Sequence, residues 1–205
     1  GMNLIINNND HPLTIKVASI QTARMQVYFI DNEDYFGRKY ILKDETGEEF
    51  SDNDERIIFF ARGVIETIKK LNWSPDLIHC IGWVSSLIPL YIKKSYYDDP
   101  LFSNTKMVYS IIGPEFHNPF RKKFKEKALM EGIEAKDLEL LNEPTYNNLN
   151  KLAIKMSDGV VKVNGDINNE LETYLEENGR LTFEHNSEND DYADEYMDFY
   201  NKLFE

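Results

Sequence analysis

The segment from residue 73 to residue 91 constrains the fold of this chain most strongly. It reads WSPDLIHCIGWVSSLIPLY, and its apolar run from Leu77 to Ile81 has the length of a buried strand. Gly82 ends that run, and apolar residues then recur from Trp83 onward at helical spacing. The segment therefore predicts a strand, a tight glycine turn and a helix. In open α/β sheets, ligands usually bind at such a turn, beyond the carboxyl end of a strand.

An amphipathic helix is predicted directly before this unit. Apolar residues between Ile57 and Ile68 recur at spacings of three and four, which places them on one wide face. Ser51, Asp52 or Asn53 is expected to cap the start of the helix, because short polar side chains accept hydrogen bonds from the free backbone N–H groups there. Such an apolar face requires a sheet to cover it.

Strands and helices alternate along the rest of the chain. The sequence predicts strands over residues 106–112, 159–163 and 180–183. It predicts helices over residues 83–96, 118–132, 145–157 and 166–177, with a short turn or helix over 134–141. Because no hairpin signal separates these strands, right-handed crossovers and a parallel sheet are expected. The expected fold class is α/β, with a Rossmann-like, mainly parallel sheet flanked by helices.

The two ends of the chain differ from this central pattern. Residues 14–20 and 25–30 predict a hairpin, and residues 4–6 are expected to extend a sheet edge. From Asn186 onward, acidic and aromatic residues dominate, and the aromatic residues keep a helical spacing. We therefore expect one domain over residues 1–185, followed by an acidic, aromatic C-terminal helix or tail over residues 186–205.

The composition argues against several classes of function. The formal net charge of −13 disfavours binding to the phosphate backbone of a nucleic acid. The one basic cluster, over residues 121–127, is interpreted as a solvated helix face. No apolar run approaches the roughly 20 residues that span a bilayer, so no membrane partner is expected. The single cysteine, Cys80, leaves no internal disulfide or thiolate metal cluster and fits a reducing cytoplasm.

The reactive side chains match no catalytic motif. The four histidines lack metal-ligand spacing, and the phosphate-loop and dinucleotide fingerprints are absent, so no catalytic residue, metal or cofactor is predicted. His79 has two interpretations, a core histidine bound to a backbone carbonyl or a ligand contact. Trp83 also has two, an aromatic floor for a sugar ring or an anchor between helix and sheet. With Gly82, these residues form the predicted substrate-binding set.

Several stretches together resemble the N-terminal catalytic domain of bacterial glycogen and starch synthases. They read DNDER over residues 52–56, FFAR over 59–62, WSPDLIH over 73–79, LIPLY over 87–91 and AIKMSDGV over 153–160. The resemblance covers roughly residues 14–175. It implies half of a two-Rossmann-domain glycosyltransferase fold, in which ADP-glucose binds between the halves and the N-terminal half also contributes to binding the α-glucan acceptor.

The sequence departs from the family pattern where that pattern carries chemistry. The family shows H-x-H-D-W-H, whereas this chain reads HCIGWV over residues 79–84. Ile81 stands where the resemblance places the histidine nearest the donor glucose, and SIIG over residues 110–113 replaces T-x-H-N. The family's first strand, its K-x-G-G loop and its C-terminal domain have no counterpart among these residues.

Two hypotheses about function follow. The first is a glycogen or starch synthase-like glycosyltransferase N-terminal domain that is inactive alone in glucosyl transfer from ADP-glucose to an α-glucan, as in a pseudoenzyme. The alternative is a noncatalytic module that binds glucan or another protein. The expected partners are an α-glucan or a nucleotide sugar, and a missing glycosyltransferase half or a homodimer partner. Without the first strand, either a rearranged strand order or pairing with a second chain is expected.

Overall fold

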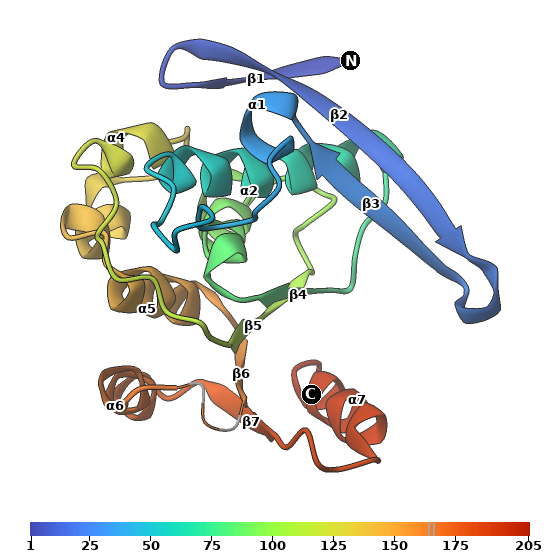
Figure 1. Ribbon diagram of the computed structural model, residues 1–205. Helices are drawn as coiled ribbons and strands as arrows, with labels where there is room; N and C mark the ends of the chain where they lie inside the picture. Colours follow the sequence, from blue (N-terminus) through green and yellow to red (C-terminus); the bar gives the residue numbers. More distant parts are fainter. Residues whose placement is uncertain (164, 166) are drawn as a thin grey trace.

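Two separate β-sheets organise the described part of the chain (Figure 1). The computed structural model describes residues 1–163, 165 and 167–205. The first sheet is antiparallel and contains β1 (Met2–Ile6), β2 (Asn9–Ile20) and β3 (Met25–Asp31), in that order. The predicted hairpin is confirmed by β2 and β3, and β1 forms the predicted extension at the sheet edge.

The second sheet is parallel and confirms the predicted fold class. It consists of β4 (Leu77–Ile81), β5 (Lys106–Ile111), β6 (Gly159–Val163) and β7 (Leu181–His185). Among the described residues its strands lie in the order β4-β5-β6-β7, which is their order in the sequence. The rearranged strand order is therefore not found, and the other expected outcome, pairing with a second chain, stays a prediction.

Most helices lie where the sequence predicts them. They are α2 (Asn53–Leu71), α5 (Tyr146–Met156), α6 (Asn169–Asn178) and α7 (Tyr192–Lys202). A further short helix, α1 (Glu33–Phe36), precedes α2. Asp166, at the predicted start of α6, lies outside the described residues. Over the part of the chain that the structure describes, no helix is both long enough and apolar enough to cross a membrane.

The helix predicted over residues 83–96 is divided into three pieces. A 3-10 helix, η2 (Trp83–Ser85), is followed by α3 (Leu87–Leu90) and by a π-helical turn, η3 (Tyr91–Ser95). Pro89 lies inside α3 and has no backbone N–H to donate to the preceding turn. The N–H of Tyr96 then donates to the carbonyl of Tyr91, five residues earlier, at 3.1 Å.

The helix predicted over residues 118–132 is mostly absent. Within this segment, all of which the structure describes, only α4 (Phe124–Ala128) is helical, and the next predicted element forms the 3-10 helix η4 (Ala135–Asn142). The rings of Phe116 and Phe120 stack at 4.7 Å and pack against Trp83. These tertiary contacts fix an irregular backbone where sequence pattern alone favoured a helix.

The two faces of the parallel sheet have different covers. On one face, Cys80, Met107 and Tyr109 join the main core together with residues of α2, α3, α5 and α6. On the other face, Val108 and Val161 pack against Phe199 of α7. A Cβ added to Gly159 would lie only 2.8 Å from the Phe199 ring, so the glycine allows α7 to approach the sheet closely.

A buried ion cluster joins the start of α2 to the segment around α4. The Asp54 side chain is fully buried and accepts hydrogen bonds from the guanidinium of Arg121 at 2.6 and 3.0 Å. Lys127 Nζ lies 3.0 Å from Asp54 and 2.9 Å from Glu55, and its side chain is 6% exposed. The interpretation of the basic cluster as a solvated face is therefore wrong for Lys127, because its ammonium group pairs in the interior with the carboxylate of Asp54, which is distant in sequence.

Replacing Asp54 by asparagine tests this cluster. Asp54→Asn keeps the shape of the side chain but leaves Lys127 buried with one of its two countercharges removed. Because Glu55 remains as a countercharge, we expect a loss of about 1–3 kcal/mol of unfolding free energy, measured by urea denaturation. Asp190→Asn, the same change at an exposed carboxylate, is the control and should leave the denaturation midpoint unchanged. Equal midpoints for the two variants would show that the cluster contributes nothing to stability.

Candidate functional site

The turn after β4 is shaped by Gly82. Its φ of +76° lies in the region that favours glycine. The Gly82 N–H donates to the carbonyl of Ser110 at 3.1 Å, and its own carbonyl accepts from the Ser85 hydroxyl at 2.8 Å. The predicted strand, glycine turn and helical segment are therefore present, with the turn bonded to the end of the neighbouring strand β5.

His79 is held between two hydroxyl groups. Its Nδ1 lies 2.6 Å from the hydroxyl of Tyr200 on α7, and its Nε2 lies 2.6 Å from the hydroxyl of Ser110 on β5. A neutral imidazole satisfies this arrangement, donating from one nitrogen and accepting at the other. Burial lowers the pKa of His79 from 6.5 to about 4, so the ring is neutral at pH 7. The partners are hydroxyls rather than the backbone carbonyl that the sequence suggested.

Trp83 lies within the main core. Its side chain is 4% exposed, and its ring meets that of Phe116 edge-on at 4.7 Å and that of Phe120 at 5.9 Å. These contacts hold Trp83, at the start of the helical segment, against the irregular chain that follows β5. His79 instead contacts Tyr196 and Tyr200 on the opposite face of the sheet. The two side chains therefore belong to different clusters, and a shared role with Gly82 in substrate binding stays a prediction.

The carboxyl ends of β4 and β5 are apolar. Ile81 ends β4 and is 59% exposed, and Ile112 and Gly113 follow β5. The five cavities described for the molecule lie elsewhere, since His79, Gly82 and Trp83 line none of them. Among the described residues, no group of three or more histidine, cysteine, aspartate or glutamate side chains is arranged to hold a metal ion.

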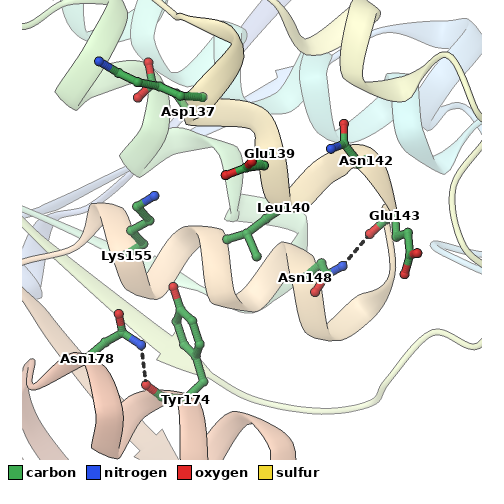
Figure 2. A pocket seen from close by; sticks show the side chains of 10 residues that line it. Asp137, Glu139, Leu140, Asn142, Glu143, Asn148, Lys155, Tyr174 and Asn178 are labelled. Atoms are coloured by element: carbon green, nitrogen blue, oxygen red, sulfur yellow. Dashed lines mark hydrogen bonds between the residues drawn. The ribbon is translucent and has the colours of Figure 1, made fainter.

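A polar cleft of about 450 Å³ lies between η4, α5 and α6 (Figure 2). Figure 2 shows Tyr174 rising from α6 toward α5, opposite Leu140 of η4. The lining of the cleft includes the side-chain amide groups of Asn142, Asn148 and Asn178. Carboxylates and amides with one aromatic ring suit a ligand that carries many hydroxyl groups. No periodic signal in the sequence marks this cleft, because its walls come from three separate helices.

A sequence model of the starch synthase catalytic domain family matches residues 2–182. The chain belongs to this family. The match includes both sheets and stops within β7, so the α7 helix that supplies Tyr200 lies beyond it.

Two glycogen synthases are similar to this family member over part of their length. The chain is 39% identical to glycogen synthase of Chlorobium luteolum over 127 residues, which are 59% of this chain and 25% of that protein. It is 36% identical to glycogen synthase of Chlorobaculum tepidum over 149 residues, which are 71% of this chain and 30% of that protein. The aligned segments are thus less than a third of the length of these relatives.

The fold of this family member also matches a solved structure. The catalytic domain of starch synthase IV from Arabidopsis thaliana, bound to ADP and acarbose, superposes with a TM-score of 0.66. The match covers 89% of this chain and 38% of that chain at 13% identity. The sequence resemblance to glycogen and starch synthases is therefore confirmed, and the likeness in structure supports the fold.

The burial of His79 predicts a pH dependence of stability. The unfolded chain takes up a proton near pH 6.5, whereas folded His79 takes one up only near pH 4. Stability should therefore fall as the pH drops through this window, because protonation favours the unfolded chain. Urea denaturation should show this loss already in the upper half of the window, before most carboxylates titrate. In a His79→Gln variant, the free energy of unfolding should depend less on pH within this window. The same pH dependence in both proteins would show that His79 does not have a lowered pKa.

Proposed function

We propose that this chain is a glycogen or starch synthase-like glycosyltransferase domain that does not transfer glucose from ADP-glucose to an α-glucan by itself. Residues 1–185 form this domain, and the C-terminal segment over residues 186–205 covers one face of its sheet with α7. The domain acts in the cytoplasm on the glucan side of the reaction. A second glycosyltransferase half supplies the groups that hold the nucleotide sugar.

The observation that carries this proposal is the apolar edge at the ends of β4 and β5. A glycosyltransferase stabilises the charge that develops on the leaving diphosphate with preorganised cations and hydrogen-bond donors. Here the strand ends present Ile81, Gly82 and Ile112, none of which has a polar side chain. His79 is neutral and bound on both nitrogens within the protein. It therefore has no free donor to offer a sugar hydroxyl.

An assay of ADP release tests the lack of transfer. The purified chain, supplied with ADP-glucose and glycogen, should release ADP no faster than a blank without protein. Glycogen synthase of Chlorobaculum tepidum, assayed in parallel, provides the positive control. Glycogen-dependent release of ADP above the blank by the 205-residue chain would overturn the proposal.

The polar cleft in Figure 2 favours a second candidate function, noncatalytic binding of an α-glucan. The similar plant catalytic domain is bound to acarbose as well as ADP, which supports considering a sugar-like ligand for this chain. Tyr174 is half-buried, with Lys151 Nζ lying 5.6 Å from the centre of its ring. Glu139 and Lys155 flank the same cleft and offer an acceptor and donors for sugar hydroxyls.

Calorimetry with maltoheptaose tests glucan binding at the cleft. We expect Tyr174→Ala to weaken binding by about 1 kcal/mol, roughly fivefold, because the apolar face of a sugar packs on the ring. Tyr97→Ala is the matched control, since Tyr97 is 68% exposed and does not line the cleft. If the unmodified chain did not bind maltoheptaose, or if both variants bound it equally, the cleft would not be a glucan-binding site.

A further inference from the structure

The β2–β3 hairpin projects beyond the body of the molecule (Figure 1). Several of its apolar side chains are exposed to solvent. Every residue from 16 to 26 is exposed. Val17 and Met25 are 56% and 52% exposed, and Phe29 is also 52% exposed. These residues lie on both faces of the hairpin, because Val17 pairs with Tyr28 whereas Phe29 pairs with Lys16. We call residues 16–29 the arm.

A concave apolar surface lies between the arm and the body of the molecule, and Arg24, Gln26 and Tyr28 of the arm form part of its lining. It consists of two adjoining cavities, of about 310 and 470 Å³, that share Tyr28, Leu71 and Trp73. Among the described residues, those that line the first cavity are all uncharged and come from β3, α2, β4 and the loop before β4. Arg24 is the one charged residue among the described residues that line the second. We call these two cavities the trough, in which Trp73 remains 57% exposed.

Strand edges without a partner border the trough. Within the described residues, β4 pairs with β5 alone and β3 pairs with β2 alone. Leu77 and Ile78 of β4, together with Ile30 of β3, line the first cavity. An apolar surface beside open strand edges is a template for another polypeptide, because the free backbone groups and the side chains can be covered together.

The total surface of the chain is large for its mass. A folded monomer of 24.0 kDa is expected to expose roughly 9,900 Å². This chain exposes 11,875 Å². The excess, roughly 1,900 Å², lies within the area that each partner buries in a permanent dimer. The arm and trough also have the composition of an interface core, in which Trp, Tyr, Phe and Met are enriched and charges are depleted.

We propose that the trough binds the arm of a second copy of this chain, in a closed dimer with twofold symmetry. Each chain carries both an arm and a trough. In a twofold dimer the arm of each copy can therefore cover the trough of the other, through two identical contacts. The arm contains two charged residues, Lys16 and Arg24, and Lys16 Nζ already pairs with Asp31 of its own chain at 2.5 Å. The proposed contact is therefore mainly apolar. The proposal goes beyond glucan chemistry, and its test contains neither glucan nor nucleotide.

Sedimentation equilibrium of the 205-residue chain is the first measurement. The mass should be twice 24.0 kDa, falling toward 24.0 kDa on dilution. Phe29→Lys on the arm and Trp73→Lys in the trough should each raise the dimer dissociation constant at least about tenfold. Ile41→Lys is the control, because Ile41 is 78% exposed and belongs to neither surface. Far-ultraviolet circular dichroism should be the same for all three variants.

Intrinsic fluorescence provides the second measurement. The chain has two tryptophans, of which Trp83 is buried and Trp73 is exposed in the trough. Emission should shift to the blue as concentration rises through the dimer transition, and Trp73→Phe should abolish that shift. A chain that stays monomeric at every concentration would overturn the proposal. So would a dimer that weakens equally in the Ile41→Lys control, or one whose formation leaves Trp73 emission unchanged.

Discussion

The buried carboxylate of Asp54 is the interaction on which the helical side of the molecule depends. It binds the side chains of Arg121 and Lys127, which reach it from a segment more than sixty residues later in the chain. A buried charge without partners carries a large desolvation penalty. Separating this segment from α2 would leave the Asp54 carboxylate without its partners, and this penalty holds the two together. The same segment brings Phe116 and Phe120 onto Trp83. One ion cluster therefore fixes both the irregular chain around α4 and the aromatic packing behind the β4 turn.

The C-terminal helix has the corresponding role on the other face of the parallel sheet. α7 inserts Phe199 against Val108 and Val161, and it places the Tyr200 hydroxyl on His79. Tyr200 lies outside the segment that matches the starch synthase family, whereas His79 lies inside it. The histidine that the family resemblance marks as part of a site is thus a satisfied member of an internal network. That arrangement supports a scaffold role for the β4 unit.

Local pattern accounts for most of the fold, and it fails where distant contacts act. The apolar face of α2 and the short runs of β4 to β6 are visible in the sequence because each buries one side against a core. The helix expected over residues 118–132 is mostly absent, since ionic and aromatic contacts with α2 and Trp83 outweigh helix propensity there. The sequence does not predict Ser110 or Tyr200 beside His79, because side-chain partners from other strands and helices leave no periodic trace.

The sequence by itself determined the class of fold, the order of its elements and the family, because hydrophobic period and motif spacing are local properties. It also determined that the end of β4 and the turn after it are formed by Ile81 and Gly82, which have no polar side chain. Only the tertiary structure decided that His79 and Trp83 belong to clusters on opposite faces of the sheet. It alone revealed the trough beside Trp73 and the cleft around Tyr174. Cavities and unpaired edges arise from how separate elements pack, and packing depends on residues far apart in the chain.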